Sequence, residues 1–262
     1  MAFLPLHDDN PRVVIAYPWV TWGLIAACAI AFFYENSGGD ALFRHLVYGY
    51  GLIPAVLTGE AQLGADLYEV PALATLVTSV FLHSGWWHLI GNMLYLWVFG
   101  DNIEDAMGHV KFLMFYMICG IIAGLAQVAA NPDSVVPTIG ASGAISGVLG
   151  AYLILHPRAR VLIPIFFIPV YVPAFLLLLF WIGFQVYAVL GTGVAGGGVA
   201  WFAHIGGFVA GVALIVPFRR KTMPLLGDRP PLGVRLRTGF RTRRRKDDRK
   251  SDRKDRRPGP WT

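Results

Sequence analysis

Apolar residues occur along this chain in long runs, and polar residues gather between the runs. Six runs reach or approach the roughly 20 residues that a helix needs to cross the ~30 Å hydrocarbon layer of a bilayer. They cover about residues 13–33, 75–99, 110–130, 140–156, 163–190 and 199–217. The pattern predicts an all-α, polytopic membrane protein whose six transmembrane helices occupy residues 13–217.

A long connection, about residues 34–74, separates the first two runs. Turn-forming residues interrupt it, namely Ser37-Gly38-Gly39-Asp40, Pro54 and Pro71. Two apolar stretches within it, residues 41–47 and 52–57, are too short to cross a bilayer. We expect them to form short amphipathic helices that lie in the membrane interface.

The composition agrees with a chain dissolved in lipid. Hydrophobic residues make up 55% of the sequence and charged residues 15%, whereas soluble domains carry about 25% charged residues. The two cysteines, Cys28 and Cys119, both lie inside apolar runs. Their number and spacing indicate neither a disulfide framework nor a metal site, and we interpret both as buried apolar side chains.

The basic charge is concentrated at one end of the chain. Residues 219–262 carry 17 Lys and Arg against 5 Asp and Glu, and only 5 basic residues precede them. Because it lacks hydrophobic periodicity, the segment 218–262 is expected to be a disordered tail that lies against anionic lipid headgroups. No folded nucleic-acid-binding module accompanies the charge, so no nucleic-acid partner is expected.

The remaining basic residues predict the orientation in the membrane. With six spans, all but Arg44 fall on the same side as the tail: Arg12, Lys111, Arg158 and Arg160. Basic residues mark the cytoplasmic side of membrane proteins. Both termini are therefore predicted to be cytoplasmic, with residues 1–12 as a short N-terminal segment.

Several polar side chains fall inside the predicted spans, where they are costly and indicate function. The second run holds His83, His88 and Asn92, and the last two share a helix face because they are four residues apart. The sixth run holds His204, and the fourth holds Ser142.

The fourth run suits Ser142 to nucleophilic chemistry. Pro137 cannot easily continue a helix, so this helix begins near Gly140 or Ala141, and it ends before Pro157. About 16 residues at 1.5 Å each give roughly 24 Å, which is shorter than the hydrocarbon layer. The N-terminus would then lie below the membrane surface, where its unpaired N–H groups could stabilise an oxyanion.

Rows of small residues could bring Ser142 and His204 together. Such rows allow two membrane helices to approach closely. One row lies on the fourth run and one on the sixth: Gly143, Gly147 and Ala151, and Ala203, Gly207 and Gly211. If these rows face each other, Ser142 and His204 come within reach.

Other interpretations of the same residues stay open. A membrane serine often only bonds a backbone carbonyl of its own helix, and a buried histidine can serve packing or a proton relay. A zinc site of His83, His88 and His204 is disfavoured, because the first two are five residues apart and no HExxH pair is present. No metal or other cofactor is expected.

Three motifs on separate predicted spans resemble those of the rhomboid intramembrane serine proteases. They are "HSGWWHLIGN", "GASGAISG" and "AHIGGFVAG", and the resemblance covers roughly residues 75–217. It implies a six-transmembrane-helix rhomboid-like bundle. It also implies that Ser142 is the nucleophile and His204 the general base of a dyad without an acidic third member.

The resemblance further implies an oxyanion hole and a supporting set of residues. The oxyanion hole would consist of the Ser142 N–H, Asn92 and His88. The supporting residues would be His83, near the water entrance, with Gly140, Gly143, Ser146 and Gly207.

The chain departs from the family pattern at two places. Ser146 stands where many members carry a tyrosine that stacks on the catalytic histidine. We therefore expect packing, or the Ser146 hydroxyl, to orient His204. Ala74 and Thr75 stand where the family often has a Trp-Arg pair.

These features predict an intramembrane serine endopeptidase that cleaves transmembrane segments of membrane proteins, located in a bacterial plasma membrane. A non-catalytic relative that binds membrane clients is the alternative within the fold. A transporter or proton channel is the alternative outside it, and paired acidic residues within the spans would favour it. The candidates are confined to one helix end: Asp101, Glu104 and Asp105.

Overall fold

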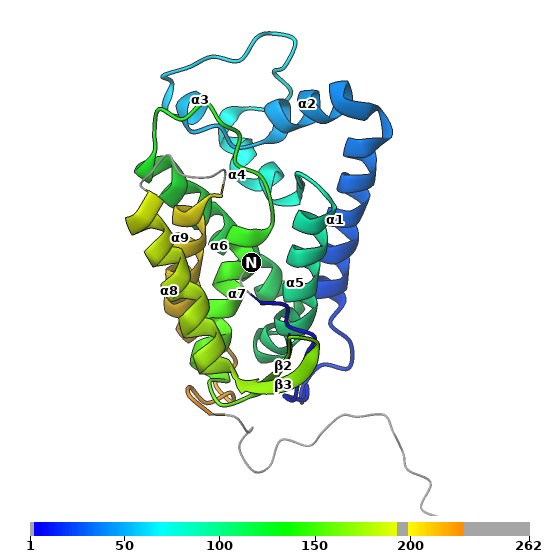
Figure 1. Cartoon of the computed structure of the whole chain (residues 1–262), viewed down its shortest axis with the longest axis vertical. Helices are drawn as coiled ribbons and strands as arrows, with labels where there is room; N and C mark the ends of the chain where they lie inside the picture. Colours follow the sequence, from blue (N-terminus) through cyan, green and yellow to red (C-terminus); the bar gives the residue numbers. More distant parts are fainter. Residues whose placement is uncertain (1–2, 193–198, 228–262) are drawn as a thin grey trace, which may run out of the picture.

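Six long helices make up the body of the molecule (Figure 1). The computed structural model describes residues 3–192 and 199–227, so the predicted basic tail lies almost wholly outside the described residues. The six helices are α1 (Trp19–Ser37), α5 (Trp86–Met107), α6 (His109–Ala130), α7 (Ser142–Leu155), α8 (Ala174–Thr192) and α9 (Trp201–Phe218). Each of the six predicted runs overlaps one of them.

The outer surface of the bundle is suited to lipid. By length and composition, α6, α8 and α9 are each apolar enough to cross a membrane, and α7 is a shorter apolar helix. On α8, Leu176, Leu179 and Phe180 are all more than half exposed. Side chains of this kind face water unfavourably, so this surface is the one that the bilayer covers.

The long first connection folds into short helices at one end of the bundle (Figure 1). They are α2 (Gly39–Tyr50), α3 (Pro54–Thr58) and η1 (Ala72–Ala74). Two more short helices, α4 (Thr75–Thr78) and η2 (Ser79–Phe81), follow at the start of the second apolar run. The helices predicted from the stretches 41–47 and 52–57 are confirmed as α2 and α3. Their position in the membrane interface stays a prediction.

The second long helix begins later than its apolar run predicted. The run was expected to span residues 75–99, but α5 covers Trp86–Met107. Leu82 has an extended backbone that ends η2, and Gly85 is also extended. At its C-terminal end the helix continues beyond the apolar run through polar residues, because their side chains have hydrogen-bond partners inside the protein.

The fifth span also begins later than predicted, because its first residues form a sheet. Two antiparallel strands, β2 (Arg160–Ile165) and β3 (Ile168–Pro173), precede α8, and β1 (His7–Asp8) pairs with β2. Prolines 164, 169 and 173 lack the N–H that a helix interior requires, and β-branched residues between them favour strands. The small sheet is an addition to the helical bundle.

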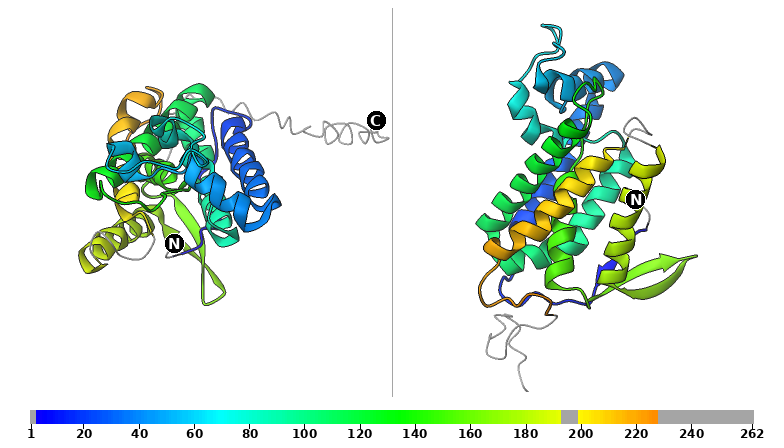
Figure 2. Two further views of the ribbon diagram at one scale, coloured as in Figure 1. Left: turned by 90° about the horizontal axis from the view of Figure 1, so that it is seen from above. Right: turned by 90° about the vertical axis from the view of Figure 1, so that its left-hand side faces the viewer.

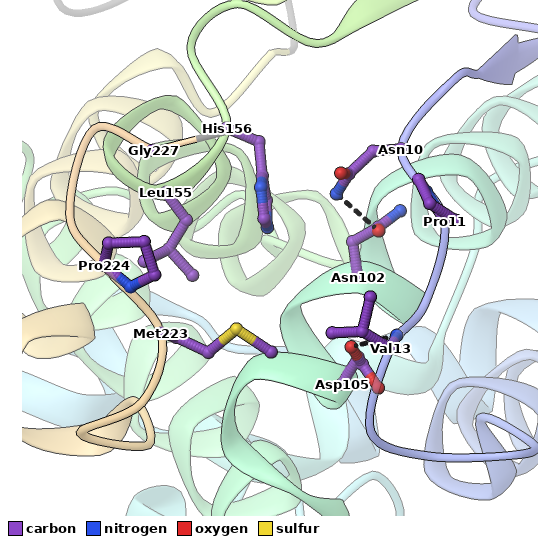
Figure 3. Close-up of a pocket in the computed structure, with 10 residues that line it drawn as sticks. All are labelled: Asn10, Pro11, Val13, Asn102, Asp105, Leu155, His156, Met223, Pro224 and Gly227. Atoms are coloured by element: carbon purple, nitrogen blue, oxygen red, sulfur yellow. Dashed lines mark hydrogen bonds between the residues drawn. The ribbon is translucent and has the colours of Figure 1, made fainter. Parts of the chain in front are cut away.

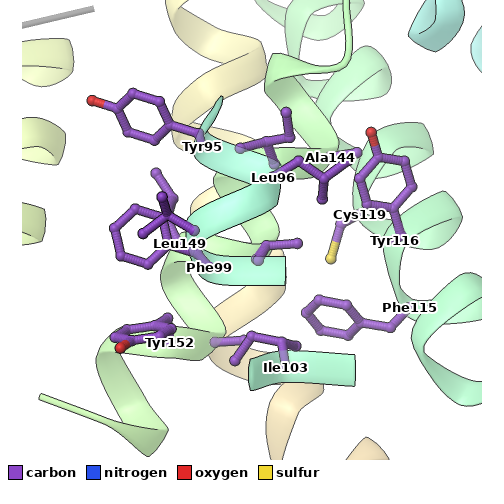
Figure 4. Close-up of a cluster of buried hydrophobic side chains, with 14 of the residues drawn as sticks. Tyr95, Leu96, Phe99, Ile103, Phe115, Tyr116, Cys119, Ala144, Leu149 and Tyr152 are labelled. Carbon is purple, nitrogen blue, oxygen red and sulfur yellow. The ribbon is translucent and has the colours of Figure 1, made fainter. Parts of the chain in front are cut away.

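Helix α7 occupies the centre of the core, packed against α5, α6 and α9. Large side chains surround it, and Figure 4 shows Phe99 and Ile103 of α5 and Tyr116 of α6 directed toward it. All three are fully buried. Cys28 and Cys119 are also buried and free, as the sequence predicted.

The backbones of α7 and α9 touch. A methyl group added at Gly207 would lie 2.0 Å from the Gly143 carbonyl oxygen, and one at Gly211 would lie 1.9 Å from the Gly147 carbonyl oxygen. The two rows of small residues predicted from the sequence therefore face each other. Only hydrogen fits at these positions.

The acidic end of α5 holds the N-terminal segment against the bundle. The Asp105 carboxylate accepts backbone N–H bonds from Val13, Val14 and Ile15 at 2.6–2.8 Å, and Glu104 accepts from the backbone and hydroxyl of Thr21. Figure 3 shows the Val13–Asp105 bond beside a small cavity at the Leu155 end of α7. These carboxylates, considered above for a relay, instead satisfy backbone groups.

We predict that Gly211→Ala destabilises the bundle. The added methyl group must push α9 away from the Gly147 carbonyl oxygen, and overpacking of this kind costs about 1–3 kcal/mol. Gly183→Ala on α8 is the matched control, since nothing lies within 4 Å of its added methyl group. Thermal unfolding in detergent measures both variants. Equal melting temperatures for Gly211→Ala and wild type would refute the close approach.

Asp8 is predicted to make stability depend on pH. Burial raises the pKa of Asp8 to about 7, although Tyr152 donates a hydrogen bond to its carboxylate. The folded chain thus binds this proton more tightly than the unfolded chain, so the free energy of unfolding falls as pH rises from about 4 to 7. Wild type should lose more thermal stability between pH 5 and pH 8 than Asp8→Asn, whose amide cannot ionise. An equal loss in both proteins would exclude Asp8 as the cause.

Candidate active site

Ser142 is the first residue of α7, where the helix leaves its backbone donors unused. The first bond within the helix runs from the Ile145 N–H to the Ala141 carbonyl. The N–H groups of Ser142, Gly143 and Ala144 therefore have no acceptor one turn back. Together with the partial positive charge of the helix end, they favour negative charge beside the Ser142 hydroxyl.

The turn before α7 requires a glycine. Gly140 has a φ of +119°, a conformation that side chains rarely adopt, and its N–H donates to the Ser79 carbonyl at 2.9 Å. A methyl group at Gly140 would also collide with the His88 ring at 2.7 Å. Gly140 thus lets the chain turn into α7 while the His88 imidazole lies beside it.

His204 of α9 contacts Ser142 directly. Its Nε2 lies 2.8 Å from the Ser142 Oγ. The two side chains lie at the same end of the contact between α7 and α9, where Gly207 packs on the Gly143 carbonyl. The close approach of the two backbones is what brings a serine and a histidine 62 residues apart into hydrogen-bond contact.

A third helix orients His204, through a residue that the sequence interpretation missed. The Nδ1 of His204 lies 2.8 Å from the Gln185 Oε1 on α8, and Gln185 is 3% exposed. An amide oxygen only accepts, so Nδ1 carries the proton and the unprotonated Nε2 accepts from the Ser142 hydroxyl. An amide inside an otherwise apolar run was the available signal, equivalent to that of His204.

The expected role of Ser146 in holding His204 is wrong. The Ser146 hydroxyl is buried and donates to the carbonyl of Ser142, one turn back in its own helix, at 2.6 Å. This local bond is the usual one for a serine inside a helix. Packing contributes through Trp181 and Trp201, whose ring centroids lie 5.9 and 6.3 Å from that of His204.

His88 has one ring nitrogen that can donate a hydrogen bond near the start of α7. The Ser84 backbone N–H donates to the His88 Nδ1 at 3.3 Å, so a neutral His88 carries its proton on Nε2. This nitrogen lies on the side of Gly140, two residues before Ser142. His88 is thus a hydrogen-bond donor close to the start of α7.

Asn92 is fully buried one turn further along α5. Its Nδ2 donates to the His88 backbone carbonyl at 3.0 Å, which uses one of its two amide hydrogens. The same nitrogen lies 3.8 Å from the position of a methyl group at Gly140. The structure therefore gathers Asn92, His88 and the first N–H groups of α7 around Gly140.

His83 packs against the ring of His88 and is fully buried. Their ring centroids are 5.1 Å apart, and the His83 Nδ1 donates to the Phe81 carbonyl at 3.1 Å. The buried Glu35 at the end of α1 accepts the His83 backbone N–H at 3.2 Å. Glu35 is a second residue that the sequence interpretation missed, and it anchors the loop that carries His83.

The described residues contain no cluster of three His, Cys, Asp or Glu side chains arranged for a metal ion. The small cavity of Figure 3 is separate from the dyad. Leu155, the last residue of α7, lines it together with Asn102, His156 and Met223. It therefore lies at the opposite end of α7 from Ser142.

Comparison with known proteins places these features in a family. A family model described as the rhomboid domain matches residues 71–221. The chain is 33% identical over 152 residues to the putative rhomboid protease YdcA of Bacillus subtilis, which covers 57% of this chain and 69% of that protein. It is 34% identical over 202 residues to the rhomboid protease GluP of the same organism, covering 76% of this chain and 36% of that protein.

Relatives also occur outside bacteria. Over 149 residues the chain is 34% identical to Rhomboid protein 1, mitochondrial, of Saccharomyces cerevisiae, which is 55% of this chain and 41% of that protein. The chain thus spans less than half the length of the yeast relative and of GluP. The match to the rhomboid family model nevertheless includes all of α5, α6, α7 and α9, with Ser142 and His204. The chain belongs to the rhomboid family.

Proposed function

We propose that the chain is an intramembrane serine endopeptidase that cleaves transmembrane segments of membrane proteins with the Ser142–His204 dyad. The observation that carries the proposal is the 2.8 Å contact between the His204 Nε2 and the Ser142 Oγ, in the tautomer that Gln185 selects. A serine that only packs needs no such partner. Membership of a family with protease-named relatives supports the same conclusion.

The first step is attack by Ser142. As its Oγ bonds to the substrate carbonyl carbon, the His204 Nε2 accepts the hydroxyl proton. The imidazolium that forms keeps its Nδ1–H on the Gln185 Oε1, at the 2.8 Å contact already present. No side chain needs to move for this proton transfer.

The second requirement is stabilisation of the oxyanion. The donors gathered around Gly140 are the Ser142 N–H, the His88 Nε2–H and the Asn92 amide. They are fixed before the substrate arrives, because each belongs to a helix end or to a side chain with a second hydrogen bond. Loss of one donor from a site of this kind costs about 10²–10³ in turnover.

The tetrahedral intermediate then collapses and the peptide C–N bond breaks. His204 transfers the proton from Nε2 to the departing amine, which leaves an acyl ester on Ser142. A water molecule hydrolyses the ester, with His204 as the base, and the Ser142 hydroxyl is restored. The substrate main chain must be extended at the cut, since a helical carbonyl is shielded by its own turn.

The same proposal includes an orientation. Strand β1 pairs with β2, and the Arg220 N–H donates to the Ala106 carbonyl, so both ends of the described chain lie at the same end of the bundle. Arg12, Arg158 and Arg219 lie in segments at that end, which the positive-inside rule assigns to the cytoplasm. The chain would then be a multi-pass protein of a bacterial plasma membrane, with Ser142 toward the outer side.

We predict that Ser142→Ala and His204→Ala each reduce cleavage roughly a thousandfold or more, because each removes one half of the dyad. Purified protein in detergent and a labelled transmembrane substrate provide the measurement. Ser37→Ala is the matched control, since its exposed hydroxyl only bonds the Tyr34 carbonyl. Cleavage by either dyad variant at the wild-type rate would overturn the mechanism.

A fluorophosphonate label separates a dead site from a wrong substrate. If wild type cuts nothing but Ser142 is labelled, the substrate was wrong. If wild type neither cuts nor reacts, the chain is a non-catalytic rhomboid-like protein that binds membrane clients.

Gln185 is predicted to be a positioning residue for His204. Gln185→Leu keeps most of the volume but removes the acceptor, so kcat should fall about 10–100-fold with little change in KM, as an orienting role requires. Gln185→Glu retains an acceptor oxygen and should recover much of the activity. Steady-state kinetics at several pH values measure both variants. If Gln185→Leu cuts as fast as wild type, the hydrogen bond does not orient the base.

A further inference from the structure

The tip of the β2–β3 hairpin is apolar and lies outside the protein core. Phe166 is 92% exposed, Phe167 is 100% exposed and Ile168 is 65% exposed. Six consecutive residues, 164–169, are Pro-Ile-Phe-Phe-Ile-Pro, without a polar side chain. Apolar surface of this kind is unfavourable in water, so a medium or partner outside the chain must cover it.

The conformation of the tip argues that these side chains do not serve the turn. Ile165 pairs with Ile168, so Phe166 and Phe167 form a two-residue loop. Their φ angles are +47° and +69°, a region that favours glycine and asparagine and is strained for bulky residues. Phenylalanine stabilises neither this turn nor the core. Its benefit must come from a contact outside the chain.

The position of the hairpin indicates what that contact is. The hairpin projects sideways from one end of the bundle (Figure 2, right-hand view), and β3 leads directly into α8. On the first turns of α8, Leu176, Leu179 and Phe180 form part of the lipid-facing surface. The base of the hairpin therefore lies at the start of α8, and its apolar tip extends outward from the end of the bundle at which this lipid-facing helix begins.

Charge at the base of the hairpin agrees with a lipid surface. Arg160 begins β2 and lies over the ring of Tyr171, 5.8 Å from its centroid, and it also pairs with Asp9. Arg158 precedes it in the chain. Tyrosine and arginine at the base of an apolar hairpin are typical of segments at the boundary between headgroups and acyl chains, where basic groups meet anionic lipids.

We propose that the β2–β3 hairpin is a membrane anchor that enters one leaflet without crossing the bilayer. It inserts Phe166 and Phe167 into the headgroup–acyl boundary of an anionic leaflet. The leaflet is the one at the end of the bundle where both chain ends lie. The hairpin contacts the bilayer in addition to the transmembrane helices. It fixes the depth of the start of α8, the helix that carries Gln185.

A spin label at the tip tests the proposal in the full-length chain. Phe167→Cys is labelled with a nitroxide in vesicles that contain phosphatidylglycerol. Cys28 and Cys119 are fully buried and do not compete for the label. We expect the label to be accessible to oxygen and protected from a water-soluble nickel chelate. Asp66→Cys, at an exposed polar site of the first connection, is the control and should be accessible to nickel.

Three results overturn the proposal. Equal nickel accessibility at Phe167→Cys and Asp66→Cys would place the tip in water. Dipolar broadening that disappears on dilution with unlabelled protein would show that a second copy covers the tip. Protection that appears only after a substrate transmembrane peptide is added would make the tip a substrate contact.

A second variant separates lipid insertion from turn stability. The double substitution Phe166→Asn with Phe167→Gly gives the turn the residues that its backbone prefers, so the hairpin should remain folded. With the label moved to Ile168→Cys, we expect nickel accessibility to rise severalfold over the same label beside the two phenylalanines. Unchanged nickel protection in the double variant would show that the phenylalanines do not anchor the hairpin.

Discussion

The direct contact between the backbones of α7 and α9 is the constraint on which the rest of this structure depends. The contact is possible because Gly207 and Gly211 present only hydrogen to the carbonyls of Gly143 and Gly147. This close approach holds Ser142 and His204 in hydrogen-bond contact, at the end where α7 begins and its backbone donors remain free.

The third side chain at the dyad is an amide, and this choice suits its surroundings. A carboxylate beside His204 would place a charge among apolar helices, where desolvation is costly. The amide oxygen of Gln185 accepts the same Nδ1–H without that cost. His204 is thus held in one tautomer by a neutral group, while hydrogen-bond donors from α7 and α5 lie close to the Ser142 hydroxyl.

Much of the fold could be predicted from the sequence, since each long apolar run and each row of small residues can be recognised within a single segment of the chain. The start of α5 and the β2–β3 hairpin could not, because apolar composition does not distinguish a span from a buried strand or loop. Prolines 164, 169 and 173 were the missed signal. Within the site, Gln185 was not predicted, because it lies outside the motifs and only the folded structure shows that it contacts His204. Ser142 and His204 were predicted because they belong to motifs. Ser146 was assigned to the wrong partner because its nearest acceptor belongs to its own helix.

The N-terminal segment has a consequence for the order of biogenesis. Residues 13–15 leave the ribosome about 90 residues before Asp105, and His7 and Asp8 leave it about 150 residues before the strand with which they pair. Until those parts are made, the backbone groups of the first segment have only water as a partner. Contacts of such long range close late. The side of the bundle where the chain begins is therefore among the last to be completed.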